Sequence, residues 1–460
     1  MTTDASHLRQ SLSDELHARA FYDFNGAGRF IRFVYLVGND DSAVLSYVND
    51  YFLSESLPPM PEEAKFHLIE TAGFALRVER HTEFLTISFV EKDLQVATGI
   101  SPDAFDQSTL PHMPFDWARN APAPLFHAVW VEVGGKPPAA LKPAAMLKML
   151  QSRAVASNNL SDSAAQVHFA FDIDDDGYSR VILFNKSIEA VRMGRVVQRI
   201  VELETYRLLA LLGLSTVKEY SARLASIEEV LSGLTNDLAK EIKKPDGQVQ
   251  GLLSVLSSQA ADVEDIYSRT SYRLSATKAY LGVLTGRLEQ MQLTRLSGFQ
   301  GVRGFLDRRM TPAMDSCNAF SERLASLSQR INRAGALLRT QTELVIQRQN
   351  RDLLQSMDER AKHQLRLQQT VERLSIAAVT YYGVGLVGYI AVSLPIDKWG
   401  LSLVDIKALA VPVIALAGEQ VDNVTWMVDA LVHFLLIDFA VRALLITFVL
   451  VRKSKQPQTA

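Results

Sequence analysis

The chain has 460 residues, a formal net charge of −3 and a single cysteine, Cys317. This length favours two or three domains, and the near-neutral charge gives no reason to expect nucleic-acid binding. One cysteine excludes both an intramolecular disulfide and a cysteine-rich metal cluster. Because Cys317 falls on the apolar seam of a predicted helix, we interpret it as a small buried side chain.

Residues 1–187 alternate between strand-like and helix-like patterns, which predicts a cytoplasmic mixed α/β domain without a secretory signal peptide. The order β-α-β-β followed by β-α-β-β raises the hypothesis of two similar halves. Strands are predicted at 29–37, 74–80, 82–90, 125–133, 165–173 and 178–185, and helices at 40–52 and after 133.

A polar cluster stands out in this domain. Glu79, His81 and Glu83 alternate in a strand-like segment, so they would share one face of the strand. Such a set could bind a metal ion or serve as an acid–base group. A solvated strand face made of charged residues is commoner, and we favour that interpretation. The sequence DIDDDG at 172–177 resembles the start of a calcium loop, but Leu183 replaces the glutamate that such a loop needs, so we predict a hairpin turn.

Residues 188–249 predict two connecting helices. The first is expected to end at Gly213, because glycine commonly terminates helices. The second is expected to end near the helix-breaking sequence KKPDG at 243–247.

Residues 250–373 carry the clearest periodicity in the chain. Apolar side chains recur at alternating spacings of three and four, from Val263 to Met291 and again from Cys317 to Val345. Each run lasts about four heptads, which is typical of a coiled coil. A Gly-rich break at 298–305 separates the runs, so we predict a stalk of two antiparallel helices.

The predicted stalk continues into an apolar segment. Residues 374–394 form a run of 21 residues without a charge, which is long enough to cross a hydrocarbon core of ~30 Å. A second span is expected within 426–451, so 374–451 would form a two-helix transmembrane hairpin with a short external loop. Arginines precede the first span and a basic tail, 452–460, follows the second, which predicts that both termini are cytoplasmic. The loop segment 408–417 is too short to span and is predicted to lie at the membrane interface.

The second span contains two charged residues, Asp438 and Arg442. Each would cost roughly 2.5–3.5 kcal/mol at the centre of an isolated membrane helix. They are four residues apart, so they can pair on one helix face and point away from lipid. The pair could line a permeation path or hold subunits together, and we favour the second interpretation.

Several phrases carry a family resemblance. They are ELHAR at 15–19, ERHTEF at 79–84, ELETYR at 202–207, DRRM at 307–310 and LRLQQTVE at 365–372. Together they resemble a bacterial family of predicted membrane-anchored proteins known as domain of unknown function 3422. Ala20, Val78 and Arg373 depart from the proline, tryptophan and glycine usual in that family. The resemblance implies architecture but no catalytic residues, because the family has no assigned activity.

The sequence therefore predicts an α+β multidomain membrane protein that acts as a scaffold or sensor. We found no Gly-rich phosphate loop, nucleophile elbow or zinc-binding helix motif, so we expect no enzyme activity, no cofactor and no metal. The expected partners are the lipid bilayer of the bacterial inner membrane and further copies of the chain, with no nucleic acid; a small-molecule or protein partner stays open.

Two other functions were considered. The first is a CorA-like two-span ion channel or transporter, although Pro-Ile-Asp at 395–397 stands where its Gly-Met-Asn signature is expected. The weaker one is a metal-dependent enzyme that uses Glu79, His81 and Glu83.

Overall fold

The computed structural model describes residues 9, 22–24, 26–139, 141–241, 250–393, 402–419, 433 and 447. The chain divides into two compact units, Met1–Thr342 and Glu343–Ala460, and each is described by itself. The polar pair Asp438 and Arg442 lies outside the described residues, as does the second predicted span apart from two isolated positions.

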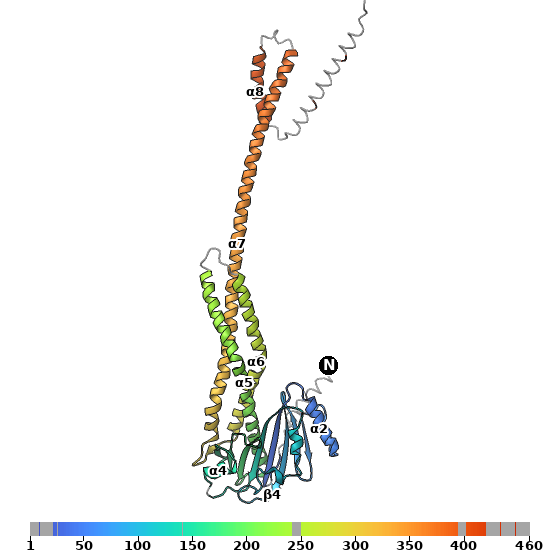
Figure 1. The fold of residues 1–460 in the computed structure, drawn as a ribbon, viewed down its shortest axis with the longest axis vertical. Coiled ribbons are helices and arrows are strands. Elements are labelled where there is room, and N and C mark those ends of the chain that lie inside the picture. The colour runs from blue at the N-terminus through green and yellow to red at the C-terminus, as the bar shows by residue number, and fades with distance from the viewer. Residues whose placement is uncertain are drawn as a thin grey trace, which may run out of the picture. The chain divides into compact units, whose positions relative to one another are not determined.

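A mixed sheet of nine strands, counted over the described residues, forms the base of the first unit (Figure 1). The strand order is β2-β3-β4-β1-β5-β8-β7-β6-β9, and β5 and β8 are parallel while the other neighbours are antiparallel. All six predicted strands are present, as β1, β3, β4, β5, β7 and β8. The strands are β1 (Ala27–Leu36), β2 (Phe66–Glu70), β3 (Ala75–Arg80), β4 (Phe84–Leu94), β5 (Leu125–Gly134), β6 (Ala156–Leu160), β7 (Ala165–Phe169), β8 (Tyr178–Asn185) and β9 (Thr294–Arg295).

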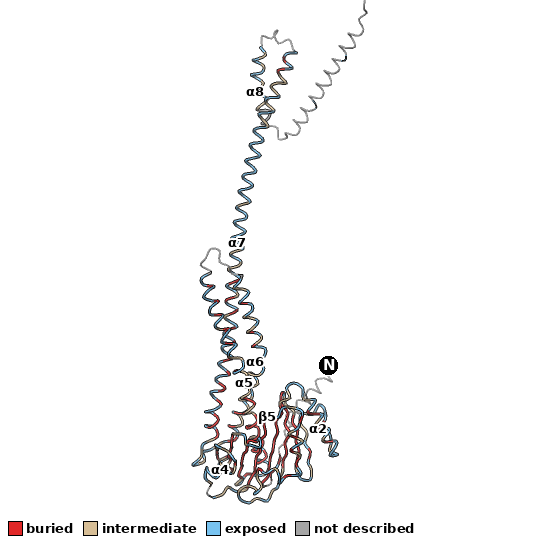
Figure 2. Tube along the Cα trace, in the orientation of Figure 1, coloured by how far each residue is buried: buried red, intermediate tan, exposed pale blue. Residues whose placement is uncertain are grey.

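Both faces of the sheet are buried (Figure 2). Ile31 and Phe33 point into one core, and their neighbour Phe30 points into the other, because successive strand residues face opposite sides. Short helices cover the first face, whereas three long helices contribute to the core on the second. The short elements are α2 (Ser42–Ser54), η1 (Gln107–Thr109), α3 (Phe115–Arg119) and α4 (Pro143–Met149).

The two halves of the sheet are similar in strand order but not in strand direction. From the centre outward, one half reads β1-β4-β3-β2 and the other reads β5-β8-β7-β6. The directions differ, however, because β1 and β4 are antiparallel whereas β5 and β8 are parallel. The halves therefore do not repeat one another as complete motifs.

Three long helices lie side by side above the sheet, rather than the two that the periodicity predicted (Figure 1). The helix from the predicted connecting segment shares an apolar core with the other two. Exposed ion pairs reinforce the packing, with Arg223 bound to Asp262 at 2.6 Å and Arg323 bound to Glu228 at 2.7 Å. The helices are α5 (Ala190–Glu241), α6 (Gln250–Gln290) and α7 (Val302–Ser393).

The predicted helix end at Gly213 is wrong, because α5 continues through it. A Cβ built on Gly213 would lie only 3.0 Å from the Cβ of Thr277 in α6. Glycine at this position therefore permits two helices to approach closely and does not terminate one. Sequence alone cannot separate these two uses of glycine.

The segment between α6 and α7 returns to the sheet. Its strand β9 pairs with β6, and the side chain of Asn158 fixes both ends of the connection. The Nδ2 of Asn158 donates to the carbonyl of Thr294, and its Oδ1 accepts from the backbone N–H of Val302, both at 2.7 Å. Asn158 thus satisfies one of the free N–H groups at the start of α7.

The second unit contains the last part of α7 and α8 (Leu403–Glu419). A Cβ built on Gly383 would lie 2.9 Å from Ile414, and one on Gly388 would meet Lys407, so the two helices run antiparallel. By length and composition, α7 is apolar enough to cross a membrane, and 11% of its most apolar 18-residue window is buried. The predicted hairpin with a second span is not shown.

Candidate functional site

Glu79 is held in a buried network on the face of the sheet that carries the long helices. It lies near the end of β3 and is 6% exposed. Its carboxylate accepts hydrogen bonds from Arg32 of β1 and Arg77 of β3, each at 2.6 Å. Arg32 also donates to Ser88 of β4 at 3.0 Å. Two guanidinium groups therefore compensate the burial of this carboxylate.

Glu83 connects the sheet to α6. It lies in the turn between β3 and β4, and its carboxylate is 3% exposed. Arg273 binds it through two nitrogens, each at 2.8 Å, and the hydroxyl of Tyr280 donates a third hydrogen bond. Burial and the bond to Glu83 raise the pKa of Tyr280, so the hydroxyl remains a donor. The turn is thereby fixed to the helix.

The expectation that Glu79, His81 and Glu83 share one solvated strand face is wrong, because Glu79 and Glu83 are buried and Glu83 lies outside the strand. The strand β3 ends at Arg80, and the backbone N–H of His81 donates to the carbonyl of Phe84 at 2.9 Å, which closes the hairpin turn. The chain reverses there, so the alternation of side chains stops. The His81 ring instead stacks on Phe84 with ring centroids 4.0 Å apart. Among the residues that the structure describes, no group of three side chains is placed to hold a metal ion.

A cavity of about 750 Å³ opens beside this turn, and we call it the hairpin cavity. Its aromatic wall is formed by Phe84, Tyr206 of α5 and Tyr280 of α6, whose ring centroids lie 5.6 to 6.3 Å apart. At its rim, Arg80 binds Asp41 through two nitrogens at 2.6 and 2.9 Å. The other polar lining residues, apart from the two tyrosines, are Asn39, Asp41, Glu62, Glu63, Lys65, Glu79, Arg80, His81 and Thr82.

The chemistry of the hairpin cavity suits recognition. The carboxylates of Glu79 and Asp41 already accept hydrogen bonds from arginine side chains. The aromatic wall can hold an apolar group while the charged rim contacts a polar one. Behind the cavity, Gln198 donates to Glu202 at 2.8 Å, and Arg287 of α6 pairs with the same carboxylate.

Comparison with known families gives a clear match. The profile of the family described as protein of unknown function (DUF3422) covers residues 4–421. The chain belongs to this family. The resemblance inferred from short phrases is therefore confirmed, and two of those phrases, 79–84 and 202–207, contain the aromatic wall residues Phe84 and Tyr206. A search of curated proteins found no match to the chain.

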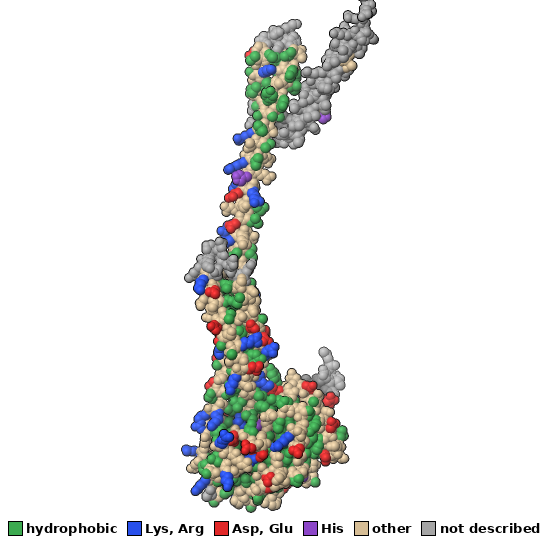
Figure 3. All heavy atoms as spheres, in the orientation of Figure 1, with side chains coloured by type: hydrophobic (Ala, Val, Ile, Leu, Met, Phe, Trp, Pro, Cys, Tyr) green, Lys and Arg blue, Asp and Glu red, His purple; other side chains and the backbone are tan. Residues whose placement is uncertain are grey.

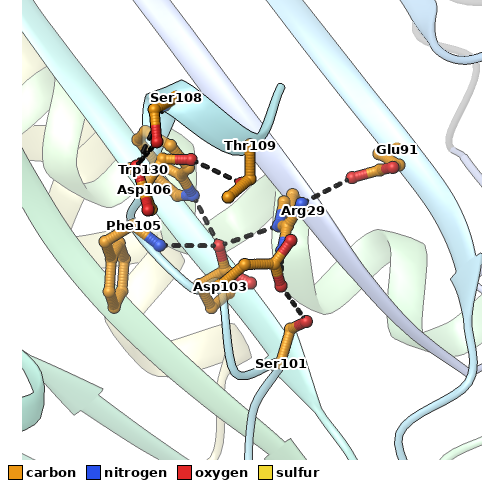
Figure 4. Close-up of polar contacts among 10 residues, drawn as sticks. Arg29, Glu91, Ser101, Asp103, Phe105, Asp106, Ser108, Thr109 and Trp130 are labelled. Atoms are coloured by element: carbon orange, nitrogen blue, oxygen red, sulfur yellow. Dashed lines mark hydrogen bonds and ion pairs between the residues drawn. The ribbon is translucent and has the colours of Figure 1, made fainter. Parts of the chain in front are cut away.

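This DUF3422 member has a second buried network, on the opposite face of the sheet (Figure 4). Arg29 donates to Glu91 at 2.9 Å, to Asp103 at 2.5 Å and to Glu132 at 3.1 Å. Burial raises the pKa of Glu132 to about 7, although Arg29 and Trp130 oppose the shift. Burial also opposes ionisation of Asp103, but hydrogen bonds from Ser101 and Arg29 lower its pKa. One guanidinium thus contacts three carboxylates, and one of them, Glu132, holds a proton below about pH 7.

Sequence reasoning missed the arginines that organise both networks. Arg29 and Arg32 lie three residues apart in the same strand, so they point to opposite faces of the sheet. Both are almost fully buried, at 1% and 2% exposed. The sequence did contain a sign of these networks, because a charged residue inside a strand that is apolar on both faces needs a buried partner. The identity of the partners was not available from spacing.

Proposed function

We propose that this protein is a non-enzymatic sensor or scaffold held in the bacterial inner membrane. In this proposal the sheet unit is cytoplasmic, both termini lie in the cytoplasm and a short loop lies outside. The chain associates with further copies of itself, and its main partner is the lipid bilayer.

The observation that carries the proposal is the continuity of α7 through different surroundings. Phe305 and Met310, near its start, belong to the core above the sheet, and Leu324 and Leu338 belong to the core of the three helices. Farther along the same helix, large apolar side chains are exposed; they include Leu374, Tyr381, Tyr389 and Val392, each 71 to 76% exposed.

An apolar helix surface exposed to water is unfavourable unless a partner or a membrane buries it. The core helix of a soluble protein is mostly buried, whereas only 11% of the apolar window of α7 is buried. Figure 3 shows hydrophobic side chains spread over α8 and the end of α7. A hydrocarbon layer would cover such side chains at no cost in unpaired backbone groups, because a helix satisfies its own hydrogen bonds.

The hairpin cavity supports the sensing part of the proposal. Two of its wall residues, Tyr206 and Tyr280, belong to α5 and α6, and these helices share their core with α7. A ligand that binds there contacts the helices directly and could change their packing. The carboxylates occupied by arginine support recognition rather than catalysis.

Single-cysteine labelling tests the anchor and its direction. Cys317→Ser removes the only cysteine, and Ser356→Cys, Gly385→Cys and Ser402→Cys then sample three positions along α7 and the loop. Gly385 has open space for a side chain. With a membrane-impermeant maleimide, Ser402→Cys should react in intact spheroplasts, Ser356→Cys only after permeabilisation, and Gly385→Cys in neither case.

Two results would refute the proposal. Rapid labelling of Gly385→Cys in intact membranes would exclude a span, and labelling of Ser356→Cys from outside would reverse the direction. Association is tested separately, by mass photometry of the full-length protein in lipid nanodiscs. A strictly monomeric protein would remove the oligomer from the proposal.

A further inference from the structure

A second cavity, of about 290 Å³, lies where α7 begins, and we call it the arginine pocket. It is formed by residues just before β6 and just after β7, by residues of α5 and by the first turns of α7. Arg153, Arg207 and Arg309 line it together with one carboxylate, Asp172. Figure 3 shows Lys and Arg side chains gathered on the surface where α7 begins.

Two of the three arginines of the pocket have no carboxylate partner in the part of the chain that the structure describes. Asp172 is occupied by Ser152, which donates to it at 2.7 Å, and by the backbone N–H of Arg153 at 3.2 Å. The guanidinium groups of Arg153 and Arg309 pair with no carboxylate among the described residues. Both are exposed at the mouth, where an anion can reach them.

Arg207 is more buried than the other two arginines and has a hydrogen-bond donor without an acceptor within the described ranges. It is 7% exposed and binds Glu204 at 2.6 Å through one Nη atom. Its Nε is buried without a hydrogen-bond partner among the described residues. A buried guanidinium N–H without an acceptor is unfavourable, and an anionic oxygen in the pocket would satisfy it.

The floor of the pocket is aromatic. The rings of Phe171 and Phe305 stack with centroids 4.8 Å apart. The guanidinium of Arg309 lies 3.8 Å from the centre of the Phe305 ring, and that of Arg207 lies 5.2 Å from the centre of the Phe171 ring. A guanidinium that is stacked in this way keeps its N–H edge free for an acceptor. Phe171 has a φ of 61°, a conformation that is rare for a bulky residue.

We propose that the arginine pocket binds a phosphate monoester that carries a small planar apolar group. The phosphate would lie among the three guanidinium groups, and the planar group would lie against the edges of the Phe171 and Phe305 rings, whose faces are covered by each other, by Phe169 and by Arg309. A phosphate offers three strong acceptor oxygens, which suits donors that converge from several segments. The volume suits a ligand of about one ring and one phosphate, near the lower limit of small-molecule sites. This inference goes beyond the membrane anchor and does not depend on it.

The test is calorimetric titration of the full-length protein in detergent with phenyl phosphate, inorganic phosphate and phenol. Phenyl phosphate should bind with a stoichiometry of one and more tightly than either of the other two probes. Arg309→Gln should weaken its binding about tenfold or more, because it removes a charge-assisted donor. Arg153→Gln should weaken it in the same direction.

Arg308→Gln is the matched control, because Arg308 is an exposed neighbour on the same helix that does not line the pocket. Its affinity for phenyl phosphate should equal that of the wild type. Thermal unfolding of each variant confirms that it is folded before titration. Absence of saturable binding by phenyl phosphate, or equal loss in Arg308→Gln and Arg309→Gln, would overturn the proposal. Equal affinity for phenyl phosphate and inorganic phosphate would overturn the assignment of the aromatic floor.

Discussion

The titration of three buried groups predicts how the stability of the protein depends on pH. Burial lowers the pKa of His127 from 6.5 to about 3, with a contribution from Arg207, and burial alone lowers that of His168 to about 3. Both histidines thus remain neutral in the folded protein but take up a proton on unfolding below pH 6.5. Their contribution to stability is present above that pH and is lost as the pH falls.

Glu132 acts in the opposite direction. Its folded pKa of about 7 lies above its ordinary value of 4.5, so it releases a proton on unfolding between these values. Its contribution is present at low pH and is lost as the pH rises. Between about pH 5 and 6, two protons are taken up by the histidines and one is released by Glu132, which leaves a net uptake of about one proton. One proton corresponds to about 1.4 kcal/mol of stability lost per unit of acidification.

Replacement of Glu132 by glutamine isolates this balance. The amide oxygen can still accept the hydrogen bonds from Arg29 and Trp130 that the carboxylate accepts now. Without the opposing titration of Glu132, the loss of unfolding free energy on acidification should rise to about 2.7 kcal/mol per pH unit. Urea unfolding at several values between about pH 5 and 6, followed by tryptophan fluorescence, measures both slopes. Equal slopes in the wild type and in Glu132→Gln would show that Glu132 is ionised in the folded protein and would refute the reasoning.

Three further predictions concern packing. Gly213→Ala should destabilise the protein by about 1 kcal/mol or more, because overpacking against Thr277 exceeds the gain in helix propensity, whereas Gly233→Ala, which has open space, should stabilise it by about 0.5–1 kcal/mol. Opposite signs in thermal unfolding check this pair. Glu83→Gln should cost about 1–3 kcal/mol in urea unfolding through its weakened bonds to α6, while an exposed control, Glu62→Gln, should stay within about 0.5 kcal/mol. Cys317 should react slowly with a maleimide until urea is added, because it is 5% exposed and burial raises its thiol pKa.

The strands that sequence predicted share a strong local signal. In β1, β5 and β8 most residues are buried, so long apolar runs mark them clearly. The missed strand β6 reads ASNNL, and its asparagines are there for contacts made by their side chains. The strand β9 has two residues and exists only because it pairs with β6. Local pattern cannot reveal an element whose stability comes from a partner 136 residues away.

The candidate site shows the same limit. Alternation correctly placed Glu79 in a strand, but it also implied a common face with Glu83, because a two-residue turn is not visible as a break in charge. The donors to Glu83, Arg273 and Tyr280, lie 190 and 197 residues farther along the chain. Heptad spacing identified the apolar faces of α6 and α7, but it did not indicate that α5 packs against them as a third helix. Partner choice depends on topology, which spacing does not contain.

The position of the arginine pocket gives the proposed sensor a testable logic. Phe305 and Arg309 form part of the pocket, and both belong to the first turns of α7, the helix with the exposed apolar segment. A ligand that prefers one packing of these turns must shift the equilibrium toward that packing, and coupling between two sites is reciprocal. If a change in bilayer thickness alters the packing of α7 against the sheet, it should therefore also change the affinity for phenyl phosphate. Identical affinities in detergent and in bilayers of different thickness would mean that the pocket and the proposed membrane segment act independently.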